Sequence, residues 1–478
     1  MSSSRHLDFV HQISRRHLLQ STGCGFGSLA LSALASGDAA AAAALSGAHH
    51  PPRAKRVIFL FMAGGVSQVD SFDHKPLLDQ QDGASLEFAD AREIAHGEKK
   101  TKARVMKSLW PFRPRGESGK QTSELFPEMS QHVDDLCFLH GMHTEGVAHG
   151  PATIFLHTGT TTQIRPSMGS WVSYGLGTAN ENLPAFVSLL PSSGNGGPRN
   201  YGSAFLPAVH QGTAIGRAGI PAAEASIRFL NNPARTPTAQ QSQFDLLQSL
   251  NRAQLAARPA ADSHLEAVIE SYELAWRMQH FAPDVLDLSG ETAETLALYG
   301  IGEKATDGYG RQCLMARRLA EAGVRYIQVN YTDNSNNPAW DQHTDMPKHA
   351  THAKAVDRPV AGLLADLKQR GLLEDTLVWW GGEFGRNPYA QNNGTGRDHN
   401  PDGFTVWLAG GGVKAGYSHG ATDEFGHMAV EGRTHMHDLH ATVLHLLGLN
   451  HEQLTYRHAG RDFRLTDVAG RVIDEIFA

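Results

Sequence analysis

The sequence is poor in cysteine. Three occur among 478 residues, and Cys24 lies in an N-terminal segment that we expect to be removed. The other two, Cys137 and Cys313, cannot form a disulfide framework, although a single bridge between them is possible. We therefore expect an ordinary hydrophobic core to stabilise the fold.

Neither sign of charge dominates the chain. It has 42 Lys and Arg against 49 Asp and Glu, a formal net charge of -7, and no long acidic or basic run. This balance argues against a nucleic-acid partner. After the N-terminal segment no apolar run reaches membrane length, so we expect no membrane span in the mature chain.

The N-terminal segment has the pattern of an export signal. Paired arginines in "SRRHLLQ" (Ser14–Gln20) precede the apolar "GCGFGSLALSALA", and small residues suitable for cleavage follow. The alternative is a basic, disordered tail, but this order of features favours a twin-arginine signal peptide over residues 1–46. It predicts a periplasmic or extracellular protein. Cys24 precedes the apolar run, which argues against a lipid anchor.

Fully apolar segments alternate with helical patterns along the rest of the chain. "RVIFLFMAGG" (Arg56–Gly65), "VRYIQVNY", "DTLVWWGG" and "FTVWLAGGG" are typical of buried strands. Apolar residues recur every three or four positions between Phe244 and Gly300, which indicates helices. The pattern predicts an α/β fold with a mostly parallel central sheet and helices on both faces. We expect one domain over residues 54–478, with a helical insertion near 225–300.

Carboxylates and histidines follow the predicted strands. In parallel α/β sheets ligands bind beyond the carboxyl ends of the strands, and carboxylate with imidazole is a ligand set for divalent metals. Each residue alone could be a polar loop residue that caps a helix. Together they predict a site for one or two ions of zinc, manganese or calcium. The candidate ligands are Asp70, Asp73, Asp341, His343, Glu383, Asp398 and His399.

Two arginines lie in the same loops as these candidate ligands. Arg386 and Arg397 could bind an anionic oxygen with two parallel hydrogen bonds. Equally, they could pair with Glu383 or Asp398. We take Arg386 as a candidate catalytic residue that assists an anionic substrate.

From about Lys55 to its end the chain resembles a known family. The segments "GGVSQVDSFDHKP", "LLEDTLVWWGGEFGRNP", "GRDHNPDGF" and "DLHATVLHLLGL" resemble the sulfatase-like domain of unknown function 1501, in the alkaline phosphatase and sulfatase superfamily. The resemblance implies the fold of that superfamily. It also implies that Asp341, His343 and His399 belong to one metal, and that Asp70 or Asp73 belongs to a second.

The resemblance extends to the turn "HGPATIFLHTG", which begins at His149. Sulfatases place a cysteine or serine nucleophile at the position of His149 and an arginine at the position of Thr153. Histidine cannot become the formylglycine of sulfatases, so the resemblance implies a ligand or a base at His149. If the reaction has a covalent step, Thr153 or a hydroxyl among residues 158–162 is the candidate nucleophile. Glu383 keeps one residue of an acidic pair, and Phe384 replaces its polar neighbour.

The leading hypothesis is a metal-dependent hydrolase of phosphate or sulfate esters, acting on an anionic small molecule or polysaccharide. A non-catalytic envelope or surface protein that retains the fold is the first alternative. A binding module for anionic polysaccharide is the second, if the helical segment forms an open cleft. We expect Asp341, His343, Glu383 and His399 to converge, with His149 facing the same cavity.

Overall fold

The computed structural model describes most of the chain. The described ranges are 47–89, 100–228, 234–257, 263–335 and 337–478. The predicted signal peptide over residues 1–46 lies outside them. In the described part, no helix combines the length and the apolar character needed to cross a membrane.

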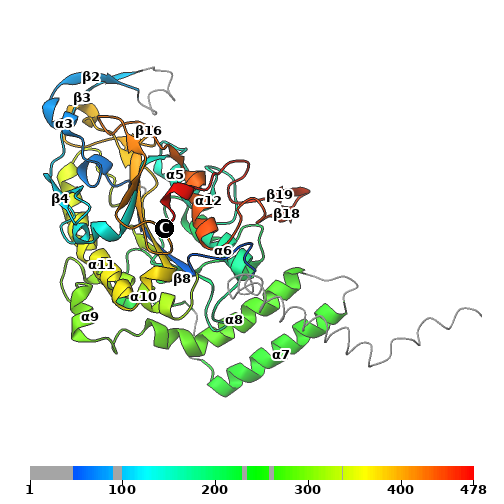
Figure 1. Ribbon diagram of the computed structural model, residues 1–478. Coiled ribbons are helices and arrows are strands. Elements are labelled where there is room, and N and C mark those ends of the chain that lie inside the picture. Colours follow the sequence, from blue (N-terminus) through cyan, green and yellow to red (C-terminus); the bar gives the residue numbers. More distant parts are fainter. Residues whose placement is uncertain (1–46, 90–99, 229–233, 258–262, 336) are drawn as a thin grey trace, which may run out of the picture.

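A nine-stranded sheet forms the centre of the molecule (Figure 1). Among its described strands only β13 runs antiparallel to its neighbours, because the β1–β10, β1–β9, β7–β9, β7–β8, β6–β14 and β6–β17 pairs are parallel. The prediction of a mostly parallel α/β sheet is confirmed. In spatial order the strands are β14 (Tyr417–His419), β6 (Leu136–His143), β13 (Phe404–Ala409), β10 (Thr376–Gly381), β1 (Arg56–Met62), β9 (Tyr326–Tyr331), β7 (Phe186–Leu189) and β8 (Thr213–Ile215), with β17 (Thr434–His435) also on β6.

The sequence of β1 explains why both faces of the sheet are covered. Side chains alternate across a strand, and both alternating sets in "RVIFLFM" are apolar. Val57, Phe59 and Phe61 join one hydrophobic cluster, while Ile58 and Leu60 join the other. Burial of both sets requires a layer of helices on each face.

Different helices cover the two faces. The face of Phe59 packs against α5 (His149–Thr158), α6 (Met168–Leu176) and α12 (Met436–Leu446). The face of Leu60 packs against α10 (Asp307–Glu321) and α11 (His349–Gln369). In the described ranges, five short two-stranded sheets lie outside the centre: β2–β3 (Ser85–Phe88, Thr101–Arg104), β4–β5 (Phe112–Arg115, Lys120–Ser123), β11–β12 (Gly385–Arg386, His399–Asn400), β15–β16 (Ala421–Thr422, Ala429–Glu431) and β18–β19 (Tyr456–His458, Arg461–Phe463). A short helix, α3 (Pro76–Gln80), precedes β2.

Three helices occupy part of the range 225–300. They are α7 (Pro237–Ala256), α8 (Ser263–Leu286) and α9 (Ala293–Leu298). Figure 1 shows α7 and α8 as a hairpin beside the α/β body, with α7 outermost. The hairpin is attached through α8, because Met278 and Ala282 of that helix pack into the core beside α10.

Candidate metal centre

The turn after β1 brings distant loops together. Gly64 has φ +112, and a Cβ there would lie 2.8 Å from the backbone nitrogens of Trp340 and Asp341. Its own nitrogen donates to Glu383, which follows β10, at 3.0 Å to Oε1. Only glycine allows the loops after β9 and β10 to approach the end of β1 this closely.

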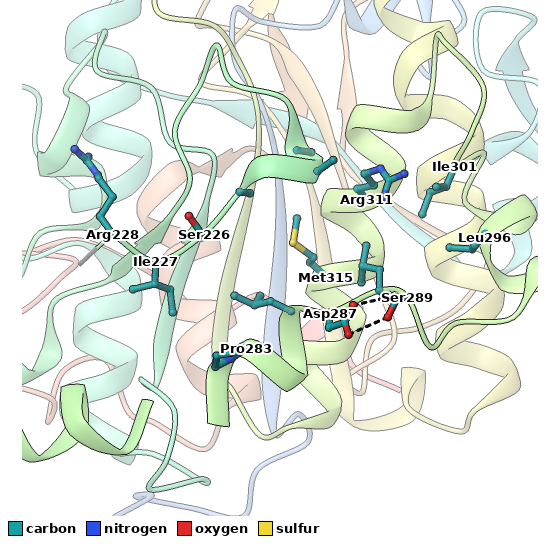
Figure 2. Close-up of a pocket in the computed structure, with 15 residues that line it drawn as sticks. Ser226, Ile227, Arg228, Pro283, Asp287, Ser289, Leu296, Ile301, Arg311 and Met315 are labelled. Atoms are coloured by element: carbon teal, nitrogen blue, oxygen red, sulfur yellow. Dashed lines mark hydrogen bonds between the residues drawn. The ribbon is translucent and has the colours of Figure 1, made fainter. Parts of the chain in front are cut away.

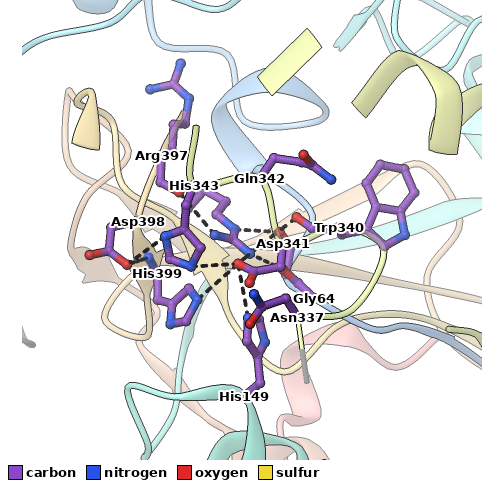
Figure 3. Close-up of polar contacts among 12 residues, drawn as sticks. Gly64, His149, Asn337, Trp340, Asp341, Gln342, His343, Arg397, Asp398 and His399 are labelled. Atoms are coloured by element: carbon purple, nitrogen blue, oxygen red, sulfur yellow. Dashed lines mark hydrogen bonds and ion pairs between the residues drawn. The ribbon is translucent and has the colours of Figure 1, made fainter. Parts of the chain in front are cut away.

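Four predicted side chains meet beyond the carboxyl ends of the strands (Figure 3). They are His149, Asp341, His343 and His399, and each offers an atom that lies within 4.8 Å of the others. His149 is the first residue of α5, and His399 lies in β12. Asp341 and His343 come from the loop after β9.

The three imidazoles direct the same atom at one carboxylate oxygen. Their Nε2 atoms lie 3.1, 2.8 and 3.3 Å from Oδ1 of Asp341, for His149, His343 and His399 respectively. Nε2 of His149 is buried and lacks hydrogen-bond geometry toward any partner. The guanidinium of Arg386 donates to the same oxygen at 2.8 Å.

The other ring nitrogen of each histidine faces an acceptor in an outer layer. Nδ1 of His149 lies 2.6 Å from Oε1 of Glu383. Nδ1 of His343 lies 2.5 Å from Oε1 of Gln391, and Nδ1 of His399 lies 2.7 Å from the carbonyl oxygen of Val147. A carbonyl oxygen only accepts, so Nδ1 of His399 carries a proton. Outer partners of this kind fix the tautomer of metal-bound histidines.

At His399 this arrangement places a lone pair against a negative charge. Burial lowers the pKa of His399 to about 4, so its ring is neutral at pH 7 and its Nε2 carries a lone pair toward Asp341. Burial acts to raise the pKa of Asp341, yet contacts with the three imidazoles and Arg386 hold it far below its usual range. Burial acts to lower the pKa of His149, but its contacts with Asp341 and Glu383 raise it. A cation among the Nε2 atoms would relieve the repulsion, so the residues fit a metal ion.

Glu383 and Asp398, both predicted ligands, lie in the outer layer. Glu383 is fully buried and accepts from Gly64 and His149. Asp398 Oδ1 accepts from the backbone nitrogen of His399 at 2.8 Å and lies 3.4 Å from Nδ1 of His343. Both carboxylates therefore contact ligands of the cluster and lie outside its four members.

Asp70 and Asp73 lie apart from the cluster. Asp70 is fully buried and pairs with Arg397, whose Nε donates at 2.8 Å; it also accepts from Ser67 and from the backbone of Leu109. Asp73 pairs with Lys75 at 3.0 Å and accepts from Thr422. The structure does not bring these two aspartates together as ligands of a second ion, because other partners occupy their oxygens.

Arg386 and Thr153 are placed differently from their predicted roles. Each nitrogen of the fully buried Arg386 donates to a protein oxygen, among them the carbonyls of Gly64 and Gly65 and the carboxylate of Asp341. From the sequence, Glu383 or Asp398 was the expected partner of Arg386, but the structure pairs Arg386 with Asp341. Thr153 lines a small cavity with Asn200, Gln328 and Asn330, which none of the four cluster residues lines. In this arrangement Arg386 holds a ligand, and Thr153 lies away from the ligand atoms.

Sequence reasoning missed Gln391. It lies in a loop rich in asparagine and glycine, and its amide accepts from His343 and donates to Asp398 at 3.2 Å. No motif or periodicity marks it. The spacing from His343 to Gln391 is 48 residues, so only the folded chain reveals the contact.

The four clustered residues do not line the large cavity of the described surface. A cavity of about 840 Å³ lies between α8, α9 and α10, with Leu286, Leu296, Ile301 and Met315 on its wall (Figure 2). Arg311 also reaches it, but Nε of that residue donates to Asp307 at 3.0 Å. None of the predicted site residues lines this cavity.

The sequence matches one known protein family over nearly all of the described chain. The family model described as "Protein of unknown function (DUF1501)" matches residues 54–477. A search of curated proteins finds no match.

Several solved structures have a similar arrangement. The lipoteichoic acid synthase LtaP from Listeria monocytogenes is 8% identical, with 88% of this chain and 76% of that chain covered and a TM-score of 0.36. The PsFucS1 sulfatase from Pseudoalteromonas sp. is 13% identical, with 88% and 71% covered and a TM-score of 0.33. An alkaline phosphatase from the Antarctic bacterium TAB5 is 9% identical, with 82% and 98% covered and a TM-score of 0.30. Similarity at this level says nothing about substrate or reaction.

Proposed function

Since the chain belongs to the DUF1501 family, whose description assigns no activity, we propose a function from the site itself. The protein binds a divalent metal ion through His149, Asp341, His343 and His399, and uses it to hydrolyse phosphate or sulfate esters. The observation that carries the proposal is the convergence of three Nε2 atoms on Oδ1 of Asp341.

The donor set favours particular metals. Three imidazole nitrogens and one carboxylate oxygen suit zinc or manganese. Calcium takes six to eight oxygen ligands, so these residues fit it poorly. We propose a single ion, because the carboxylates that could bind a second one have other partners. Asp70 pairs with Arg397, and Glu383 accepts from Gly64 and His149.

An ion in this site would supply a Lewis acid for the attack of water on an ester. The chain contributes the remaining functions. Glu383 accepts the Nδ1 proton of His149 and so keeps the Nε2 atom of that ring free for the ion. The N-terminus of α5 adds a positive end of a helix at the same place, and no side chain caps it. Such a helix end stabilises an anionic oxygen, so an anionic small molecule or polysaccharide is the proposed substrate class.

The test combines elemental analysis with turnover. Purified protein is expected to carry about one equivalent of zinc or manganese and to hydrolyse members of a panel of phosphate and sulfate monoesters. The variant His399→Ala is expected to lose both the ion and the activity. A matched control is His280→Ala, which changes an exposed histidine of α8 outside the site. Protein that carries the ion and turns over no ester, with or without added metal, would refute the hydrolase.

A specific observation favours a second candidate function. Four protein ligands are the usual number for structural zinc, whereas catalytic zinc keeps one position for water or substrate. In addition, the guanidinium groups of Arg386 and Arg397 donate to protein oxygens and not toward a site for an anionic substrate. A non-catalytic envelope or surface protein that keeps the metal for stability would have these features. Removal of the metal would then lower the unfolding temperature and cost no activity.

We also propose export by the twin-arginine pathway. The proposal rests on the paired arginines in "SRRHLLQ" and the apolar segment that follows. Substitution of both Arg15 and Arg16 by Lys is expected to keep the protein in the cytoplasm, as measured by cell fractionation. Unchanged export of this variant would refute the pathway.

A further inference from the structure

The outer helix of the hairpin has apolar side chains on two opposite sides. Toward α8, the ring of Phe244 stacks on Trp276 at 5.1 Å, and Gln248 donates to the carbonyl of Ile269 at 3.1 Å. On the opposite side, Leu246 and Leu250 are 61% and 59% exposed. A helix with apolar residues on two sides is typical of one covered on both. In the described chain only the side toward α8 is covered.

The exposed residues follow a coiled-coil repeat. We define the outer seam as Ala239, Gln243, Leu246, Leu250 and Ala253, all of which are exposed. Their spacings are four, three, four and three residues. A spacing that averages about 3.5 residues keeps a stripe of side chains facing a partner helix. The seam therefore suits a second helix that lies along α7.

The outer seam is complementary to itself. Two copies of α7 can pair antiparallel about a two-fold axis that crosses the seam midway between Leu246 and Leu250. Leu246 of one copy then meets Leu250 of the other. The same axis brings Gln243 opposite Ala253. The two leucines therefore pack against each other, and the longer Gln243 lies against the small Ala253. A two-fold interface requires a patch that matches itself in this way.

The distribution of charge also favours an identical partner. The charged residues of α7 are Asp245 and Arg252, and neither belongs to the seam. Arg252 contacts Glu273 of α8 at 2.5 Å, and Asp245 accepts from Gln241 of its own helix. Two copies of the seam therefore meet without like charges. Helices that lie on membranes carry several Lys and Arg beside their apolar face, whereas α7 has one Arg and no Lys, and that Arg pairs with Glu273.

We infer that α7 is a dimerisation helix, which pairs through its outer seam with α7 of a second copy of this chain. This surface is separate from the metal cluster. Two helices of 20 residues, each roughly 30 Å long, bury less than the roughly 1,600 Å² of a standard stable interface. The dimer is therefore expected to dissociate at about micromolar concentration.

The first test is sedimentation velocity of the full chain over a range from about 1 to about 200 µM. The unmodified protein is expected to shift from monomer to dimer, and the double variant Leu246→Glu with Leu250→Glu to weaken the dimer at least about tenfold. Val430→Glu with Val468→Glu is the matched control, because both valines are exposed elsewhere, at 58% and 86%. A protein that stays monomeric throughout, or a dimer that the seam variant leaves intact, would overturn the inference.

A crosslinking test is independent of the folding of the charged variant. In a Cys24→Ser background, Leu246→Cys and Leu250→Cys proteins are prepared separately and then mixed under mild oxidation. The mixture is expected to form a disulfide-linked dimer, while each protein alone is not, because antiparallel pairing opposes residue 246 to residue 250. Crosslinking of either protein with itself and not with the other would indicate parallel pairing and contradict the proposed axis.

Discussion

The imidazole of His149 lies between two carboxylates, with Nδ1 at 2.6 Å from Oε1 of Glu383 and Nε2 at 3.1 Å from Oδ1 of Asp341. All three side chains are almost fully buried. The outer carboxylate fixes which ring nitrogen carries the proton, and so leaves the inner nitrogen for a metal. The two carboxylates thus have different functions, although each follows a strand that pairs with β1.

We expect Glu383→Ala to lower the affinity for zinc about 10- to 100-fold, because outer partners of metal-bound histidines have effects of this size. Glu383→Gln should show a smaller loss, since its carbonyl can still accept from His149 while its amide nitrogen opposes the nitrogen of Gly64. Isothermal titration calorimetry measures both. Glu374→Gln, at an exposed residue before β10, is the matched control. Unchanged affinity in Glu383→Ala would exclude Glu383 from the site.

Asp70→Asn tests whether Asp70 serves the fold or a metal. Its removal leaves Arg397 buried without a counter-charge, because both side chains are fully buried. We expect a loss of about 3–5 kcal/mol in the free energy of unfolding, as for other broken buried pairs, measured by urea denaturation. The metal content of the folded variant should stay the same. A folded variant that loses an equivalent of metal would make Asp70 a ligand.

The sheet was predictable because its central strands β1 and β10 are almost wholly apolar. A strand such as β1, with both alternating sets of side chains buried, leaves few alternatives to a parallel sheet between two layers of helices. Asp341, His343 and His399 were predictable because the carboxyl ends of parallel strands meet at one edge. These inferences need only local sequence and one rule of topology.

The partners of the candidate residues could not be predicted in this way. Asp70 and Arg397 are separated by 327 residues, and nothing local to Asp70 distinguishes a buried ion pair from a metal ligand. The contact of Gln391 with His343 could not be predicted for the same reason, since nothing in the sequence distinguishes a neutral amide in a polar loop from its neighbours. Which carboxylate binds and which supports depends on the ring nitrogen of His149 that each one faces.

The pH dependence of stability should carry a contribution from Asp357 of α11. Burial raises its pKa from 3.8 to about 7, against the lowering effect of the backbone nitrogens of Glu128 and Met129, which donate to it. Because the folded state holds this proton more tightly than the unfolded state, stability falls as the pH rises from about 4 to about 7 and is level above that range. The change should amount to roughly 2–4 kcal/mol.

Asp357→Asn isolates this contribution, since it removes the titrating group and keeps an oxygen that can accept. The free energy of unfolding, measured with urea at intervals from pH 4 to pH 8, is compared between the two proteins so that all other groups cancel. We expect the unmodified protein to lose stability relative to the variant across this range. A difference that does not change with pH would contradict the raised pKa.

Gln391 should control how His343 presents its Nε2 atom. Among the four clustered side chains His343 is the most exposed, at 25%, so it is held by fewer neighbours than the others. Its Nδ1 atom lies 2.5 Å from the side-chain oxygen of Gln391, with Asp398 at 3.4 Å as the second acceptor.

Gln391→Ala is expected to weaken zinc binding about tenfold. Gln391→Glu should restore part of the affinity, because a carboxylate accepts the same hydrogen bond from His343 but faces Asp398 where the amide donated. Gln342→Ala is the control, since Gln342 neighbours His343 in the chain but donates to the carbonyl of Ala339. A purely structural role would give equal losses for the Ala and Glu variants, so recovery in the Glu variant alone identifies Gln391 as the residue that orients His343.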